Sequence, residues 1–302
     1  MSDEGQPEGF YLPTASSTCT QTYWQFLSAY KEAIDFFFFT LNLAHRADDV
    51  ALTAAKALID LETDEEKKAR LQTHIENPVR VAKELHRFSE ISSKNISTSI
   101  ADSFLWYISN IIQQAMKRKP EIIKSGETVK IEEIFNYPSR RELLNYLIDR
   151  KINTLSYGGL KQIEKFISEA LNIDLFSTEK DRNLLRIFIE VRNIQTHNRG
   201  YVNRIFLDRV EDLLPSSHFK FKEGKKAHLD FDDLSMISKV CVTTSLDLDA
   251  KTAQKFGIKR KRISTWLKDK TSPPKPCSNG GQAASKLAQG RSSETGGWDA
   301  HK

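Results

Sequence analysis

Apolar residues recur at three- and four-residue steps in one segment after another, and this periodicity most constrains the fold. Such spacing is typical of amphipathic α-helices that bury one face. Between residues 96 and 258, glycines, prolines and polar loops separate these segments. Four or five such helices with short connections predict an antiparallel helical bundle. Its expected core residues are Ile100, Phe104, Ile108, Ile111 and Ala115, then Leu143, Leu144, Leu147, Ile148 and Ile152, then Leu160, Ile163, Phe166, Ile167 and Ala170.

The first part of the chain predicts additional helices. Residues 1–20 are rich in Gly, Pro, Ser and Thr and are expected to form a disordered leader. Residues 21–95 are expected to form an N-terminal helical region that begins near Tyr23. Four consecutive phenylalanines make its first helix apolar nearly all round, so we expect that helix to be buried. Further helices are predicted at residues 47–61, from a capping box at 63–66 to residue 75, and at 79–91.

The charge of the chain is unevenly distributed. The whole sequence carries +5, whereas residues 259–302 contain ten Lys or Arg against three Asp or Glu, a surplus of seven. Residues 1–258 therefore carry −2 (+5 minus +7), and nonspecific attraction to polyanions is expected to belong to the tail. Residues 259–302 are expected to be a disordered, basic, low-complexity tail. Alternation around a glycine predicts a small hairpin over residues 219–231.

Composition excludes several classes of protein. The most apolar run, the four phenylalanines at 36–39, falls far short of the roughly 20 residues that a bilayer span needs. Residues 1–9 lack the basic and apolar parts of a secretory signal. Three widely separated cysteines give no disulfide framework and no metal-ligand spacing. We therefore expect a cytoplasmic protein with no membrane partner and no cofactor.

The most chemically distinctive stretch is residues 190–200, at the end of a helix predicted over residues 181–199. The apolar pattern of that helix places Arg192 on its core stripe, where it would otherwise put an aliphatic side chain. A cation there requires a carboxylate, an anionic ligand or a subunit interface. Asn193 and His197 share a helix face, whereas Arg192 and His197 lie roughly 140° apart. The two converge on one ligand only if the helix end distorts or a second chain contributes.

Gly200 stands where a helix commonly ends, and the chain continues as Tyr201-Val202-Asn203. The string from Arg192, Arg-Asn-x-x-x-His-Asn-Arg-Gly-Tyr-Val-Asn, resembles the signature of HEPN domains, in particular the RiboL-PSP-HEPN-like branch. The helices predicted across residues 96–258 fit the same resemblance, which leaves both ends of the chain outside it. The resemblance implies a HEPN-like helical bundle, a homodimer and a metal-independent endoribonuclease that acts on single-stranded RNA.

The resemblance also assigns roles to five residues. Arg192 and His197 become catalytic, and Asn193, Asn198 and Arg199 become substrate-binding or orienting residues. Asn193 is expected to orient His197 or to contact the substrate. Cleaving RNA without a metal requires a base for the 2′-OH, an acid for the leaving oxygen and a cation over the charge that develops on the phosphate. Two copies of the Arg192 and His197 pair across a two-fold axis can supply these groups. Histidine suits the proton transfers because its unperturbed pKa is about 6.5.

Structural alternatives stay open. Arg192 can pair with Glu190 or with a carboxylate on another helix, and His197 can cap the helix end through its carbonyls. A HEPN-like bundle can also act as a noncatalytic module for dimerisation or partner binding, and a regulatory protein partner is a further expectation. Some toxin-type HEPN domains carry a tyrosine two residues after the histidine, and Arg199 stands there instead. The other six histidines show no metal-ligand spacing, so no metal site is expected.

Overall fold

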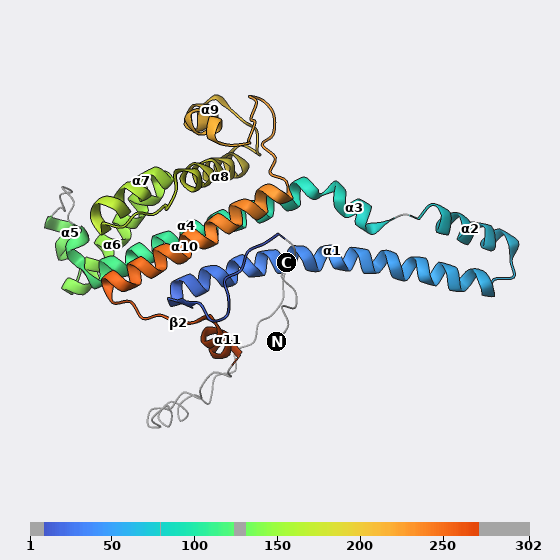
Figure 1. The fold of residues 1–302 in the computed structure, drawn as a ribbon, viewed down its shortest axis with the longest axis horizontal. Coiled ribbons are helices and arrows are strands. Elements are labelled where there is room, and N and C mark those ends of the chain that lie inside the picture. Colours follow the sequence, from blue (N-terminus) through green and yellow to red (C-terminus); the bar gives the residue numbers. More distant parts are fainter. Residues whose placement is uncertain (1–8, 79, 124–130, 272–302) are drawn as a thin grey trace, which may run out of the picture.

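The structure, a computed structural model, describes residues 9–78, 80–123 and 131–271, which are mostly helical (Figure 1). The predicted all-α class is confirmed. Within these ranges, every helix is too short or too polar to cross a membrane. Two short strands, β1 (Thr18–Cys19) and β2 (Lys261–Arg262), pair antiparallel. The helices are α1 (Gln21–Leu61), α2 (Glu65–Glu76), α3 (Val81–Arg87), α4 (Ser89–Arg118), α5 (Ile131–Phe135), α6 (Arg140–Tyr157), α7 (Gly159–Phe166), α8 (Glu179–His197), α9 (Arg204–Val210), α10 (Phe231–Phe256) and α11 (Ile263–Thr271), with short 3-10 or π segments at η1 (Pro120–Ile123), η2 (Ile167–Leu171) and η3 (Glu211–Ser216).

Helix α1 runs without a break through a region where the sequence predicted two helices. Its 41 residues contain no proline or glycine, so nothing interrupts the backbone hydrogen-bond ladder. Thr20 caps its start, because the Thr20 hydroxyl accepts a hydrogen bond from the backbone N–H of Tyr23 at 3.2 Å. At about 1.5 Å per residue the helix is roughly 60 Å long, so it reaches well past the rest of the fold.

The body of the protein is organised around α4, whose predicted core stripe is confirmed. Helix α10 lies beside α4 and runs in the same direction, whereas α1 packs on α4 in the opposite direction (Figure 1). The antiparallel arrangement predicted within residues 96–258 therefore holds for α4 with α8 but not for α4 with α10. Helix α8 returns the chain to the end at which α4 begins, and α10 starts from that end. The fully buried stripe of α4 consists of Ile100, Phe104, Ile108, Ile111 and Ala115.

The first half of α1 shares one core with the bundle. Tyr23 of α1 donates from its hydroxyl to the carbonyl of Val242 in α10 at 3.2 Å, and Tyr107 of α4 donates to the carbonyl of Ser245 at 2.9 Å. The Tyr23 and Tyr107 rings meet edge to face, with centroids 5.8 Å apart. The core is therefore not divided at residues 95/96, where we placed the boundary between the N-terminal region and the bundle. The reason is that the buried stripe of α1 finds its partners in α4 and α10.

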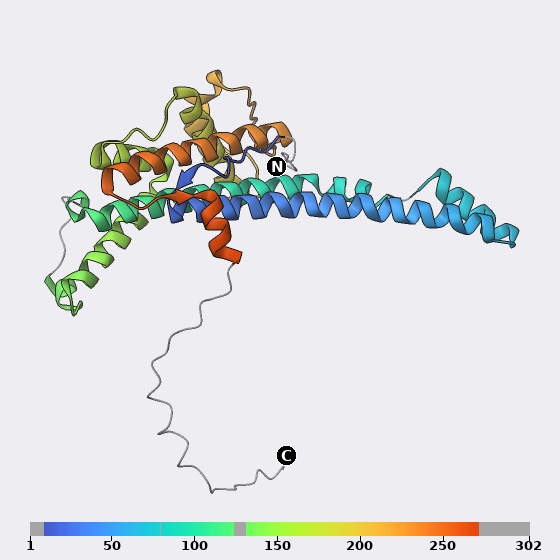
Figure 2. The ribbon, with the colours of Figure 1, turned by 60° about the horizontal axis from the view of Figure 1, so that its bottom comes forward.

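The second half of α1 leaves the body and forms an arm together with α2 and α3 (Figures 1 and 2). We define the arm as residues 36–87. Asp48 of α1 accepts hydrogen bonds from the backbone N–H groups of Val81 and Ala82, at 2.6 and 3.0 Å, and so fixes the start of α3. The opposite side of α1 is open, and Phe36 is 71% exposed. The prediction of a helix buried nearly all round is therefore wrong for the arm.

Both ends that we predicted to be disordered contain ordered structure where they are described. Strands β1 and β2 pair, and Asp249 in α10 accepts hydrogen bonds from the backbone N–H and the hydroxyl of Thr20, at 3.0 and 2.5 Å. Arg260 reaches the same carboxylate at 3.5 Å. These contacts correct the prediction for the second half of the leader and the first part of the tail, because a buried carboxylate holds both. Residues 1–8 and 272–302 lie outside the described ranges.

The structure confirms one of the local predictions for the edge of the body and contradicts two others. Ser139 caps α6 as predicted, since its hydroxyl accepts a backbone hydrogen bond from the first turn of the helix at 3.2 Å. Ile148 alone of the five expected α6 core residues is fully buried, because α6 packs at the edge of the body against α4. The hairpin predicted over residues 219–231 is wrong. Lys226 instead makes a single bridge with Tyr201, since that segment pairs with the turn after α8 rather than with itself.

Candidate functional site

Helix α8 carries the predicted motif at its C-terminal end. Thr178 caps its start by accepting a hydrogen bond from the backbone of the first turn at 3.1 Å. At its end, the N–H groups of Asn198 and Gly200 both donate to the carbonyl of Ile194, at 2.8 and 2.9 Å. Arg199 and Gly200 have φ values of 52° and 82°. The helix therefore ends in a left-handed turn, which Gly200 was expected to make and which Arg199 makes as well, although its Cβ disfavours that conformation.

Three of the five predicted site residues line one open groove. The groove has a volume of about 800 Å³ and is bounded by α4, the turn from α6 to α7, α8 and the segment from α9 to η3. Arg192, Asn193 and His197 lie along its α8 wall. Asn198 and Arg199 follow in the turn and do not line the groove. The groove falls in the size range of typical ligand sites in proteins.

Arg192 lies at the edge of the core rather than within it. Its side chain is 22% exposed, and its Nε and Nη2 atoms both contact Oδ1 of Asp102 in α4, at 2.7 and 2.5 Å. This is the inter-helix carboxylate partner that was one of the expected alternatives. A second contact joins the same two helices: Gln195, on the buried side of α8, accepts a hydrogen bond from the hydroxyl of Ser97 in α4 at 2.6 Å. Arg192 is therefore one of two polar links between α8 and α4.

Asn193 belongs to a polar chain on the groove wall. It accepts a hydrogen bond from Nη1 of Arg192 at 3.3 Å and donates to the carboxylate of Glu190 at 3.4 Å. Glu190 also accepts from Arg209 of α9 at 3.1 Å. Asn193 thus orients Arg192, whereas the sequence had suggested that it orients His197. Glu190 is not the partner of Arg192 that one alternative proposed.

His197 presents an exposed imidazole to the groove. Among the described residues it makes no hydrogen bond, so it neither caps the helix end nor contacts Arg192 or Asn193. Within one chain the Arg192 and His197 side chains therefore line the same groove without a hydrogen bond between them. Asn198 has a structural role, because its amide donates to the carbonyl of Tyr201 at 2.7 Å and closes the turn after α8.

The groove contains further charged residues that the sequence analysis did not single out. Arg186 is paired with Glu164 of α7 at 2.7 Å, whereas Lys161 makes no ion pair with the described residues. One signal in the sequence does point to the partner of Arg192. Asp102 is the only acidic residue between Glu90 and Glu121, so it stands out in that helix as a candidate partner for a cation. The other groove-lining charged residues are Arg209, Glu190, Asp208 and Asp212.

Comparison of the chain with protein-family models, with curated proteins and with solved structures gives no significant match. The side chains of the groove are therefore the guide to its function. Within residues 9–78, 80–123 and 131–271, no three His, Cys, Asp or Glu side chains gather closely enough to hold a metal ion. The chemistry available in the groove is that of guanidinium, ammonium, imidazole and carboxylate groups.

Proposed function

We propose that the protein is a metal-independent endoribonuclease of the HEPN type that cleaves single-stranded RNA in the α8 groove, with two copies of the chain forming each site. The observation that carries this proposal is that Arg192, Asn193 and His197 line one open groove with the imidazole exposed and uncommitted. Arginine binds phosphate through a planar fork of donors. An uncommitted histidine can accept or donate a proton near neutral pH.

The chemistry explains why a second copy is required. Attack of a 2′-OH on the neighbouring phosphate needs one group to remove the hydroxyl proton and another to protonate the departing 5′ oxygen. One chain offers one imidazole in the groove, and a single imidazole cannot serve as the base and the acid at the same time. A two-fold related copy would add a second His197 and a second Arg192. One imidazole would then act as the base and the other as the acid, while a guanidinium neutralises the phosphate.

The Arg192 and Asp102 ion pair fits a resting state of this site. The Asp102 side chain is 54% exposed, and such partly exposed pairs contribute about 0–1 kcal/mol. Both guanidinium nitrogens contact a single carboxylate oxygen, so the fork does not make two parallel bonds. A phosphate can therefore displace Asp102 from Arg192 at low cost and make both bonds. Lys161 adds a second cation for the RNA backbone.

One observation favours a second candidate function. Asp102 already neutralises Arg192 within the chain, so the groove has no need of an anionic ligand. In that case the bundle is a noncatalytic module for dimerisation or partner binding, and Arg192 serves its structure.

The test is cleavage of a panel of unstructured RNAs by the purified protein in EDTA. We expect cleavage with products that end in a 2′,3′-cyclic phosphate, because the attacking group is the 2′-OH. Absence of cleavage across the panel would favour the module.

The variant Asp102→Asn separates the two candidates further. If Arg192 binds RNA, the loss of its competing carboxylate should raise RNA affinity a few-fold, which corresponds to about 1 kcal/mol. If Arg192 is structural, RNA affinity stays unchanged and the variant only loses up to about 1 kcal/mol of stability.

A further inference from the structure

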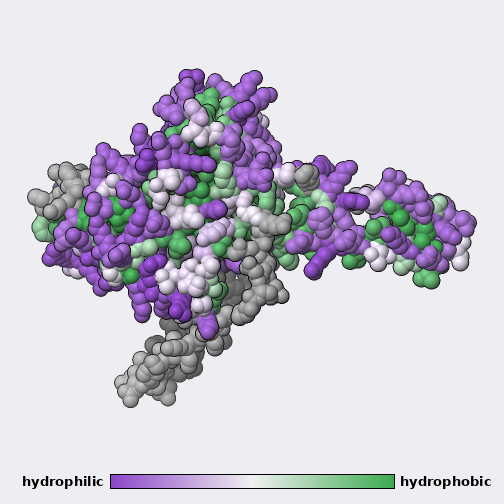
Figure 3. Space-filling view, viewed as in Figure 1, coloured by the Kyte–Doolittle hydropathy of each residue, from purple (hydrophilic) through white to green (hydrophobic). Residues whose placement is uncertain are grey.

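The outer side of the arm carries an apolar stripe that has no partner in the described chain. Six of the seventeen large apolar side chains that are exposed among the described residues lie on α1 between positions 36 and 61. In Figure 3, apolar residues lie among the polar ones over the arm. With exposed alanines they recur at steps of three and four residues, the spacing of a coiled-coil seam. The stripe consists of Phe36, Phe39, Leu43, Ala47, Val50, Ala54, Ala57 and Leu61.

This stripe is distinct from the face of α1 that α2 and α3 cover. The covered face includes Ala44 and Ala55, which are buried, and Asp48, which caps α3. At about 100° per residue, the centres of the two faces lie roughly 120° apart around the helix. In Figure 2, which brings the lower side of the molecule forward, α1 of the arm runs uncovered along its length. The chain therefore presents a second helix-packing surface.

We propose that this stripe binds the same stripe of a second copy of the chain, as an antiparallel helix pair. In an antiparallel seam, residues of the two alternating apolar positions face each other. The register that matches the stripe to itself places Leu43 opposite Leu61 of the second copy, Ala47 opposite Ala57, and Val50 opposite Ala54. The layers from Leu43 to Leu61 then hold apolar side chains only, and the alanines let the two helices approach closely. In this register Phe36 and Phe39 lie past the end of the second copy's α1, which stops at Leu61.

Charge complementarity supports both the partner and the direction. Arg46 and Asp60 lie on the same flank of the stripe, are exposed, and make no ion pair with other described residues. They are 14 positions apart (60 minus 46), which is two heptads. In the register above, Arg46 faces Asp60 of the second copy and Asp60 faces its Arg46, so two ion pairs close the same interface. A parallel pair would place Arg46 beside Ala51 of the second copy and Asp60 past the end of its α1, so neither charge would gain an oppositely charged partner on α1.

Other occupants fit the stripe less well. After Thr271, the sequence contains only two large apolar residues, Leu287 and Trp298. The tail therefore has no apolar seam that matches the stripe. An RNA backbone requires an excess of positive charge, whereas this flank carries one cation and one anion. A second copy satisfies the apolar layers and the charges together.

The arm contact is separate from the groove contact of the proposed function. In the antiparallel register the two copies of Ile34, where α1 leaves the body, lie roughly 50 Å apart at about 1.5 Å per residue. The arm therefore cannot bring two grooves together. It would join pairs of groove dimers into larger assemblies, and it can exist whether or not the protein cleaves RNA.

Cysteine cross-linking tests the register, in the full chain with Cys277→Ser as the background, since Cys19 and Cys241 are buried. A mixture of Ala47→Cys and Ala57→Cys chains should form a disulfide-linked dimer on oxidation. Either variant alone should not, because the like positions lie about 15 Å apart in this register, beyond the roughly 7 Å Cα separation that a disulfide spans. Linking of Ala47→Cys with itself would show a parallel pair, and no linking in the mixture would overturn the proposal.

A second measurement uses mass in solution. Val50→Asp, at an exposed position, should leave the melting temperature unchanged and lower the molar mass measured by light scattering. A fall to the mass of a dimer would mean that the groove dimer remains after the arm contact is lost. A fall to the mass of a monomer would support the arm contact and count against the groove dimer. Arg46→Asp should also lower the mass, and adding Asp60→Arg should restore it. An unchanged mass in both Val50→Asp and Arg46→Asp contradicts the arm contact.

Discussion

The two halves of α1 have similar composition but opposite environments. In the body half, Tyr23, Phe26 and Tyr30 are fully buried between α4 and α10. In the arm half, Phe36 and Phe39 are largely exposed, although four phenylalanines stand in succession there. The hydrophobic content of a helix thus does not decide whether it is buried. What decides is whether neighbouring helices present complementary faces, and in the arm only one face of α1 has such neighbours.

The largest expected effect comes from removing equivalent aromatic rings from the two halves. Phe26→Ala should destabilise the protein by about 3–5 kcal/mol, because it leaves a cavity beside Tyr107, whose ring lies 5.5 Å away. Phe36→Ala, in the same helix, should change stability by no more than about 0.5 kcal/mol. Urea unfolding of both variants measures the difference. Equal losses would contradict the assignment of the two halves to body and arm.

The next effect concerns Asp249, the buried carboxylate that binds the start of α1. Asp249 is fully buried and binds the cap of α1, and burial raises the pKa of its carboxyl above the ordinary value of 3.8. The folded state then holds this proton more tightly than the unfolded state. The contribution of Asp249 to the free energy of unfolding is therefore largest below about pH 3.8, and it is lost as the pH rises through the raised pKa.

The pH dependence follows from this sign. Asp249→Asn removes the titration, so the stability of the variant relative to the wild type should increase from about pH 4 to about pH 7. Unfolding curves at the two pH values measure it, with Asp48→Asn as the matched control. A stability difference between Asp249→Asn and the wild type that stays constant with pH would show that this carboxyl does not titrate differently on folding.

The smallest expected effect lies in the arm. Asp48→Ala removes the acceptor for the N–H groups of Val81 and Ala82 and should cost about 1 kcal/mol, within the range for lost helix caps. Hydrogen exchange should speed up in α3 and leave the buried part of α4 unchanged. Faster exchange throughout α4 would mean that the arm and the body unfold as one unit.

The apolar periodicity of the sequence predicted those features that depend only on residues close together in the chain. The core stripe of α4 and the caps at Ser139 and Gly200 follow from local spacing, and the structure places them as expected. The partners of isolated charged groups depend on residues far along the chain. Asp102 pairs with Arg192 across 90 positions, and Asp249 binds Thr20 across 229. No local pattern specifies such pairs.

The same limit applies to the groove. The spacing of Arg192, Asn193 and His197 predicted which side chains stand out, and all three line one groove. It did not predict that Asn193 binds Arg192 and Glu190 instead of His197, because hydrogen-bond geometry at a helix surface depends on α4 and α9. Arg199 was expected to bind substrate, yet it forms part of the left-handed turn outside the groove.

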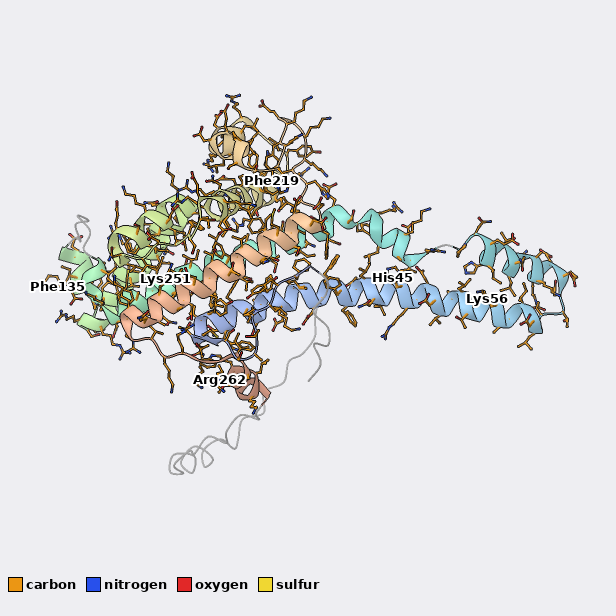
Figure 4. All side chains as sticks on the ribbon, in the orientation of Figure 1. His45, Lys56, Phe135, Phe219, Lys251 and Arg262 are labelled. Atoms are coloured by element: carbon orange, nitrogen blue, oxygen red, sulfur yellow. The ribbon has the colours of Figure 1, made fainter. Side chains whose placement is uncertain are left out.

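The most direct test of the central claim is the rate of RNA cleavage in EDTA by three proteins: the wild type, His197→Ala and His45→Ala. His45 lies on α1 in the arm, away from α8 (Figure 4), so it controls for loss of an exposed histidine. We expect His45→Ala to match the wild type and His197→Ala to lose about 100-fold or more, the usual contribution of a general acid or base. A folded His197→Ala protein that cleaves at the wild-type rate would contradict the claim.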